Sequence, residues 1–238
     1  MRMLGELLEF SIAIDPLDSA VAFYRTLGFR EAPVGNIVGD AYIPMSLETV
    51  TIGLRLEGSR DPVPTFVRPS LKEHLRGFKH LDIALEFSEL ADDQFHRAGF
   101  RDPNGLLLVL LEARTTSPLP LDVSIVSPLG EFLEYSAPTH SLDDSGRFWD
   151  KLGVHEVAGG DSPQPWRRIQ GHGLTLGLYA GRRFQPGLTF ACDNAAARIA
   201  YLEAKGCHLQ RPGPFGLPEH EVVALETPAQ PIYLATHA

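Results

Sequence analysis

The chain has 238 residues and a formal net charge of −9 at pH 7. Nucleic-acid binding depends on a clustered basic surface, so this charge argues against a nucleic-acid partner. No stretch approaches the roughly 18 uninterrupted apolar residues of a membrane-spanning helix, which argues against a membrane partner. Residues 1–10 show no apolar run followed by a small-residue cleavage site, and the two cysteines lie in different predicted elements. We therefore expect a cytoplasmic protein with reduced thiols.

The sequence repeats itself at an offset of 125 positions. Residues 7–29, LLEFSIAIDPLDSAVAFYRTLGF, align without gaps with residues 132–154, FLEYSAPTHSLDDSGRFWDKLGV. The residues that are identical in both copies are, in the first copy, Leu8, Glu9, Ser11, Leu17, Asp18, Phe23, Leu27 and Gly28. A repeat of this kind predicts two copies of one structural unit.

Each copy begins with a strand that leads into a helix. Alternating apolar residues predict strands over 8–14 and 133–137, and an apolar stripe at helical spacing follows each of them. Gly28 and Gly153 fit the position just after the helix, where glycine tolerates a left-handed backbone best. Each copy is therefore expected to have the order β-α-β-β-β, with later strands at 50–57 and 174–180.

Two further units follow the same plan with weaker similarity. In residues 79–113 we expect a strand over 80–87, a helix ending at Ala98-Gly99, and a closing strand, without the two middle strands. Residues 187–236 are expected to form a complete fourth unit. The Pro- and Ser-rich segment 114–130 is the predicted linker between a first pair of units in 1–113 and a second pair in 131–238.

The four tandem units, the helices FYRTLGF and FWDKLGV, and the DPNG turn at 102–105 make this sequence similar to the vicinal oxygen chelate superfamily. Glyoxalases, extradiol dioxygenases and bleomycin-resistance proteins belong to that superfamily, and the resemblance covers nearly the whole chain. It implies an α+β fold in which pairs of βαβββ units form cup-shaped mixed sheets, with the helices outside. It also implies a small organic ligand bound in the cup.

Strand alternation indicates which side chains face the cups. In the first half these are Glu9, Ser11, Arg55, His80 and Asp82. In the second half they are Glu134, Ser136 and Tyr179, and the Gly- and Pro-rich loop with Trp166 is expected to cover that cup.

The resemblance implies metal ligands on the first and last strands of the units. The corresponding positions of the first half carry Glu9, Gly53, His80 and Val109, which include two donors. Those of the second half carry Glu134, Gly177, Gly187 and Leu234, which include one. We expect no complete metal site; the alternative is one divalent ion (Fe, Mn, Ni or Zn) held by Glu9 and His80.

Two classes of function follow from this resemblance. The first is a metal-independent protein that binds a small organic molecule. The second is a lyase, isomerase or dioxygenase in which Glu9 is a metal ligand or general base and His80 a ligand or proton carrier. A structural role is also open, in which Arg55 or His80 neutralises Glu9, and Tyr179 hydrogen-bonds to Glu134. Both a monomer and a homodimer are compatible with the sequence.

Overall fold

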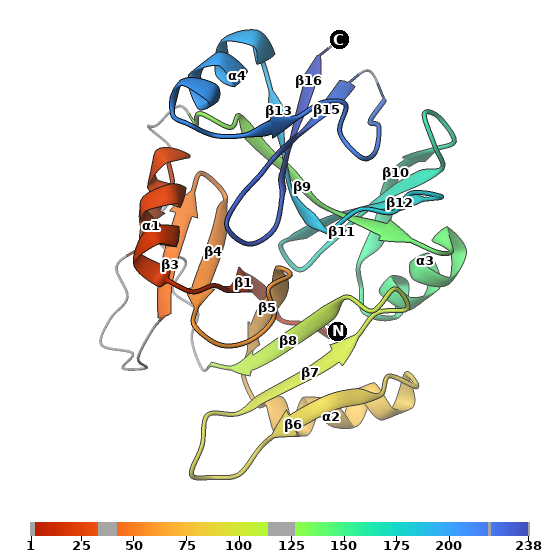
Figure 1. Cartoon of the computed structure of the whole chain (residues 1–238). Helices are drawn as coiled ribbons and strands as arrows, with labels where there is room; N and C mark the ends of the chain where they lie inside the picture. Colours follow the sequence, from red (N-terminus) through yellow and green to blue (C-terminus); the bar gives the residue numbers. More distant parts are fainter. Residues whose placement is uncertain (1–2, 33–41, 114–126, 219, 238) are drawn as a thin grey trace.

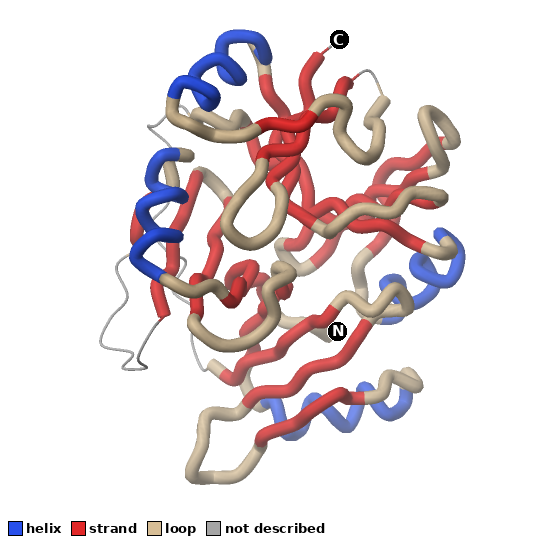
Figure 2. Tube along the Cα trace, in the orientation of Figure 1, coloured by secondary structure: helices blue, strands red, loops and turns tan. Residues whose placement is uncertain are grey.

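The computed structural model describes residues 3–32, 42–113, 127–218 and 220–237, which form two open mixed sheets and four helices (Figures 1 and 2). The first sheet has the order β2 (Arg30–Glu31), β3 (Tyr42–Leu47), β4 (Val50–Arg55), β1 (Glu6–Ala13), β5 (Val63–Arg68), β8 (Leu107–Glu112), β7 (Arg97–Arg101) and β6 (Leu85–Glu89). The second has the order β10 (His155–Gly160), β11 (Trp166–Gly171), β12 (Leu174–Ala180), β9 (Glu131–Thr139), β13 (Gly187–Cys192), β16 (Ile232–His237), β15 (His220–Leu225) and β14 (Leu209–Gln210).

The strand order shows that each sheet contains two βαβββ units. The helices are α1 (Leu17–Thr26), α2 (Leu71–His80), α3 (Leu142–Lys151) and α4 (Ala195–Ala204). Strand β1 is parallel to β4 of its own unit and antiparallel to β5 of the next unit, and β9 pairs with β12 and β13 in the same way. The first unit therefore pairs with the second and the third with the fourth, which confirms the α+β class and the tandem arrangement.

The prediction for the second unit is wrong in its boundaries. This unit is complete: it begins with β5, continues through α2, and retains all three later strands. Residues predicted as a strand over 80–87 include the end of α2, and residues predicted as a helix form a turn and β7. The sequence around Pro62 and Pro64 does not indicate a strand, because proline is rare inside a sheet, and β5 was therefore not predicted.

The helix ends follow the local sequence. In α3, the Ser141 hydroxyl accepts a hydrogen bond from the backbone N–H of Asp144 at 3.2 Å and caps the first turn. Gly28 and Gly153 follow the first and third helices with φ values of 92° and 81°, as the sequence predicts. Among the described residues, no helix has the length and apolar composition needed to cross a membrane.

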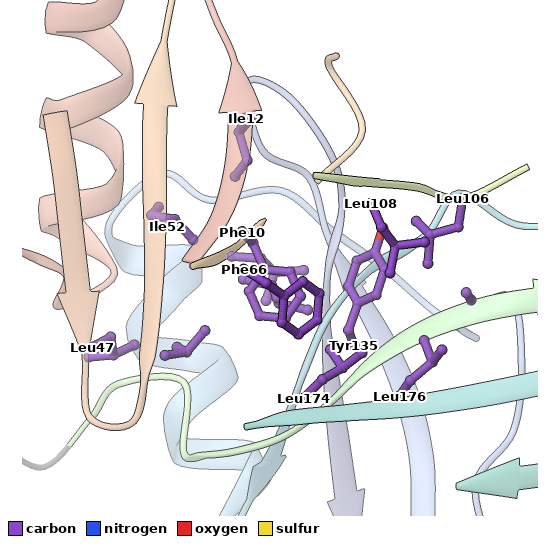
Figure 3. Close-up of a cluster of buried hydrophobic side chains, with 14 of the residues drawn as sticks. Phe10, Ile12, Leu47, Ile52, Phe66, Leu106, Leu108, Tyr135, Leu174 and Leu176 are labelled. Carbon is purple, nitrogen blue, oxygen red and sulfur yellow. The ribbon is translucent and has the colours of Figure 1, made fainter. Parts of the chain in front are cut away.

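One continuous apolar core joins both sheets and all four helices. Figure 3 shows Phe10 and Phe66 of the first sheet beside Tyr135 of the second. The ring centroids of Phe10 and Tyr135 are 5.2 Å apart, and the Tyr135 hydroxyl donates to the Pro62 carbonyl at 3.0 Å. The opposite face of each sheet points away from this shared core. Most of the predicted linker, residues 114–126, lies outside the described residues.

The DPNG turn also joins the two halves. The Asn104 side-chain amide donates to Ser145 Oγ at 2.9 Å, and its oxygen accepts from Thr139 Oγ1 at 3.0 Å. Burial raises the pKa of Asp102, whereas hydrogen bonds from Leu106 and Asn104 lower it. The motif that marks the end of a unit in the sequence thus fixes the first half onto the second.

Candidate functional site: two buried carboxylate clusters

The predicted residues Glu9 and Glu134 lie on the face of each sheet that points away from the core. We call this the carboxylate face, because it carries Glu9 in the first sheet and Glu134 in the second. Both strands contain a register shift directly before the glutamate, between Leu7 and Glu9 and between Phe132 and Glu134. The glutamate side chains are fully buried on these faces, with 0% exposure in each case.

In the first sheet, three side chains donate hydrogen bonds to Glu9. Ser11 Oγ lies 2.7 Å and Arg55 Nη2 lies 2.9 Å from Glu9 Oε1. The Tyr42 hydroxyl donates to Glu9 Oε2, and the Arg55 guanidinium carbon lies 4.3 Å from the Tyr42 ring centroid. Ser11 also contacts Thr65 Oγ1 at 2.9 Å. The structure thus brings together the predicted residues Glu9, Ser11 and Arg55.

The second sheet contains a cluster of the same chemical composition. Ser136 Oγ donates to Glu134 Oε1 at 2.8 Å, and Arg168 Nε donates to Glu134 Oε2 at 2.6 Å. The Tyr179 hydroxyl donates to Glu134 Oε1. Ser136 also contacts Thr189 Oγ1 at 2.6 Å. Of the predicted residues, Glu134, Ser136 and Tyr179 therefore meet in one cluster.

The two clusters obtain their arginine and tyrosine from different strand positions. In the first sheet, Tyr42 of β3 pairs with Arg55 of β4. At the equivalent pair of the second sheet, Trp166 of β11 lies opposite Tyr179 of β12, and the arginine is supplied by Arg168. Each half therefore surrounds its glutamate with one guanidinium, one phenol and one serine hydroxyl, although the two strands that supply the guanidinium and the phenol have exchanged roles.

Both clusters require a glycine beside the glutamate. A Cβ atom on Gly53 would lie 2.2 Å from Glu9 Oε1, and one on Gly177 would lie 1.8 Å from Glu134 Oε1. These distances are far below a van der Waals contact, so any larger residue would displace the carboxylate. The close approach explains why the repeated pattern IGL/LGL keeps its central glycine.

The phenols of the clusters are held in their neutral form. Burial, reinforced by the charge of Glu9 and its hydrogen bond, raises the pKa of Tyr42 far above the ordinary value. Burial and the charge of Glu134 have the same effect on the pKa of Tyr179. Both tyrosines therefore donate hydrogen bonds to a carboxylate, while the arginines supply the balancing positive charge.

His80 and Asp82 do not lie where the sequence predicted, and Trp166 packs in one cluster with Tyr179 but from a strand rather than from the expected loop. His80 is the exposed last residue of α2, on the core side of the sheet, so it does not meet Glu9. Asp82 follows in an exposed turn with a φ of 55°. Trp166 begins β11 with 8% exposure, and its ring centroid lies 5.7 Å from the Arg168 guanidinium carbon. His80 and Asp82 are misplaced because the second unit begins earlier in the chain than predicted, at β5. Trp166 is misplaced because β11 begins at this residue, inside the segment predicted as a loop.

The observed strand registers place other residues than the sequence predicted at the positions that would correspond to metal ligands. Thr65, rather than His80, pairs with Glu9 and Val109. In the second sheet Thr189, rather than Gly187, pairs with Glu134, and its partner on the last strand is Tyr233, rather than Leu234.

The residues present do not fit a divalent metal. Each cluster offers one carboxylate, and a guanidinium nitrogen already lies within 2.9 Å of it in the first sheet and 2.6 Å in the second. The remaining positions supply hydroxyl groups and aliphatic side chains instead of the imidazole and carboxylate ligands that such ions prefer. Within the described ranges, no group of three or more His, Cys, Asp or Glu side chains could hold a metal ion.

The sequence does not single out Tyr42, Thr65 or Arg168. Tyr42 and Arg168 lie on middle strands whose pairing the sequence does not define. The alternation in WRRIQG is the one signal that places Trp166 and Arg168 on the same face of a strand. Thr65 lies in β5, which Pro62 and Pro64 make difficult to recognise as a strand. Strand alternation places Thr189 on the cup face of its strand, but the resemblance points to Gly187 as the metal-ligand position because the sequence does not define the register.

Comparison with solved structures identifies the fold. A crystal structure of catechol 2,3-dioxygenase matches with a TM-score of 0.60 and 16% identity, covering 99% of this chain and 88% of that one. Homoprotocatechuate 2,3-dioxygenase from Arthrobacter globiformis matches with a TM-score of 0.65 and 15% identity, covering 98% and 80%. The Brevibacterium fuscum enzyme of the same name matches with a TM-score of 0.65 and 13% identity, covering 98% and 72%.

The sequence comparisons add no closer relative. No protein-family model matches the chain, and no curated protein matches it significantly. The structural likeness nevertheless covers nearly the whole chain and includes both pairs of units. The chain has the fold of the extradiol dioxygenases, and with it the fold of the vicinal oxygen chelate superfamily that its sequence resembles.

Proposed function

We propose that this protein binds a small organic molecule on the carboxylate face of the first sheet, without a metal ion, and that the Arg55 guanidinium anchors it. The observation that carries this proposal is the difference in exposure within the ion pair. The Arg55 side chain is 37% exposed, whereas the Glu9 side chain to which it is bonded is 0% exposed. The cluster thus presents a fixed, accessible guanidinium above a buried counter-charge.

The contacts of Arg55 support its role as an anchor. Glu9 accepts from one terminal nitrogen, and the Tyr42 ring lies against the guanidinium plane at 4.3 Å. A guanidinium has five N–H donors in a planar fork, so further donors remain for a carboxylate or another planar oxygen acceptor. A side chain that is already held in place loses little entropy when such a ligand binds.

The same face provides apolar surface for the rest of a ligand. Leu107, Val109 and Leu111 of β8 alternate onto this face and are partly exposed, whereas Leu108 and Leu110 are buried in the core. Ligand sites commonly combine apolar walls with a few fixed polar groups. The ligand class proposed is therefore a small carboxylate with an apolar body.

The geometry gives less support to an enzyme that uses Glu9 as a general base. A general base must reach the proton that it removes. Glu9 is fully buried, and Ser11, Tyr42 and Arg55 already donate to its two oxygens. His80, the proposed proton carrier, is on the other side of the sheet.

A thermal-shift experiment with paired probes tests the proposal. Benzoate and phenylacetate are compared with benzamide and phenylacetamide, which keep the shape but lack the charge. We expect the carboxylates to raise the Tm of the wild-type protein more than the amides do, and Arg55→Lys to weaken carboxylate binding at least about tenfold because the planar fork is lost. Arg147→Ala, which removes an exposed arginine of α3 that pairs with Asp144, is the control away from this face and should bind as the wild type does.

Two results would overturn the proposal. One is equal stabilisation by each carboxylate and its amide. The other is unchanged carboxylate affinity in Arg55→Lys. Chromatography of the same mixtures addresses the enzymatic alternative, since a new product that disappears in Glu9→Gln would favour turnover over binding.

A further inference from the structure

A second apolar cluster covers the carboxylate face of the second sheet. Its buried members are Trp166, Tyr179, Phe215, Leu217, Val222, Ala224, Tyr233 and Ala235. This cluster is separate from the core that joins the two sheets. It lies directly over the Glu134 cluster, because Tyr179 belongs to both.

The ring of Phe215 lies at the centre of this cluster. Its centroid lies 4.5 Å from that of Tyr179, 4.6 Å from that of Phe184 and 5.0 Å from that of Tyr233. The Phe184 ring is stacked at 27°, and the Tyr233 ring meets it edge-on at 78°. Phe215 is only 4% exposed, so aromatic rings enclose it as they would enclose a flat ligand.

Phe215 reaches this position from a loop that the Gln164 side chain holds beside the ring. The loop connects β14 to β15 and lies over the sheet. The Gln164 side chain donates to the Gly216 carbonyl at 2.6 Å and accepts from the Gly216 N–H at 3.2 Å. Gln164 is itself buried, with 6% exposure, and thus clamps the residue that follows Phe215.

The equivalent loop of the first half is arranged differently. It connects β6 to β7 and also carries a phenylalanine, Phe95, but that side chain is 62% exposed. On the sheet beneath, Val109 occupies the position equivalent to Tyr233, and it is partly exposed whereas Tyr233 is buried. One half thus has a filled carboxylate face and the other an accessible one.

We infer that Phe215 acts as an internal ligand: the second sheet contains a site for a flat apolar ring, and the chain fills that site with its own phenylalanine. External aromatic molecules are therefore excluded from the second half unless the loop is released. The protein then offers one accessible carboxylate face per chain, that of the first sheet. This inference stands whether or not the first sheet binds a carboxylate.

Replacing Phe215 in the full-length protein tests the inference. Toluene has the ring and methyl group of the phenylalanine side chain, and apolar cavities left by removed side chains bind such molecules. We expect Phe215→Ala to lower the Tm and toluene to raise the Tm of this variant, because a ligand that binds only the folded state stabilises it. Wild-type protein and Phe95→Ala, the matched control, should have similar Tm values and no toluene response.

Gln164→Ala provides a second test that keeps the aromatic ring. Loosening the clamp lowers the cost of displacing Phe215, so toluene should stabilise this variant more than it stabilises the wild type. This test decides the question even where Phe215→Ala does not fold. The inference is overturned if toluene stabilises the wild type as strongly as Phe215→Ala, if Phe215→Ala and Phe95→Ala have the same Tm, or if Gln164→Ala shows no increased response.

Discussion

Glu9 and Glu134 are neutralised by the same three kinds of side chain, and this balance explains how two carboxylates can be buried. Each receives hydrogen bonds from an arginine, a tyrosine and a serine. An isolated buried carboxylate would be costly, whereas a paired and fully hydrogen-bonded one is tolerated. The glutamate that is repeated in the sequence is therefore the centre of a structural cluster in both halves.

Removing the arginine should destabilise the second cluster more than the first. Arg168→Ala leaves Glu134 buried without a cation and is expected to cost about 3–5 kcal/mol. The Arg55 side chain is 37% exposed, so after its truncation water can enter and solvate the Glu9 carboxylate in place of the guanidinium. We expect Arg55→Ala to cost about 1–2 kcal/mol. Urea unfolding of both variants measures the difference.

A double variant provides the control for this comparison. Glu134→Gln combined with Arg168→Ala removes both charges, so its loss of stability should be smaller than that of Arg168→Ala alone. If Arg168→Ala unfolds like the wild type, the ion pair does not stabilise the buried carboxylate.

The buried tyrosines predict a loss of stability at alkaline pH. Burial raises the pKa of Tyr24 to about 12 and raises the pKa values of Tyr42, Tyr135, Tyr179 and Tyr233 as well. An unfolded tyrosine ionises near pH 10. The neutral phenols therefore stabilise the fold fully below about pH 10, and this contribution is lost as the pH rises above that value because only the unfolded chain releases the protons.

Absorbance near 295 nm measures the ionisation of the tyrosine side chains. At about pH 11 the folded protein should show far less tyrosinate than the urea-unfolded protein, and its urea midpoint should be lower than at about pH 9. Complete ionisation of the six tyrosines in protein that remains folded would contradict the buried hydrogen-bonded arrangement.

The strands carry the clusters, and the glycine beside each glutamate side chain makes room for it. Gly53 and Gly177 lie on β4 and β12, next to the strands with the register shifts. Introducing a Cβ atom at either position should displace the carboxylate, because the atom would lie within about 2 Å of it. We expect Gly53→Ala and Gly177→Ala each to cost about 1–3 kcal/mol.

Gly146→Ala is the matched control for these variants. Gly146 lies inside α3, and a Cβ atom there would lie 3.8 Å from its nearest neighbour, Arg167 Nη1. Alanine should stabilise this helix by about 0.5–1 kcal/mol. Thermal unfolding of the three variants gives the comparison, and an unchanged Tm in both strand variants would contradict the close approach.

The sequence predicts the elements that its repeat covers, but it does not predict the second unit. The helices and strands of the two matched segments were recognised because alternation and helical spacing agree with the repeat. The residues that donate to Glu9 and Glu134 were only partly recognised, because register between strands depends on long-range pairing. Arg55 and Tyr179 could be placed by alternation on strands of known direction. Tyr42, Thr65 and Arg168 depend on pairings that one sequence does not reveal.

The two halves share one apolar core. Phe10 packs against Phe132 and Tyr135, and the backbone N–H of Leu7 donates to the His172 carbonyl at 2.8 Å. Because each half contributes side chains to the same buried cluster, neither can lose its packing without exposing the other.

Calorimetry tests this shared core. We expect a single unfolding transition whose calorimetric and van't Hoff enthalpies agree, since the halves lose their packing together. Asn104→Ala, which removes hydrogen bonds across the joint, should lower the Tm without splitting the transition. Two separate transitions in the wild-type protein would show that the halves unfold independently.

Arginine and tyrosine side chains neutralise the buried glutamates in both halves, and we propose that no metal ion takes part. Elemental analysis of protein purified without chelator tests it most directly, with Glu9→Gln and Glu134→Gln measured alongside. We expect far less than one equivalent of Fe, Mn, Ni or Zn per chain and the same Tm with and without EDTA. About one equivalent of metal per chain that is lost in either variant would contradict it.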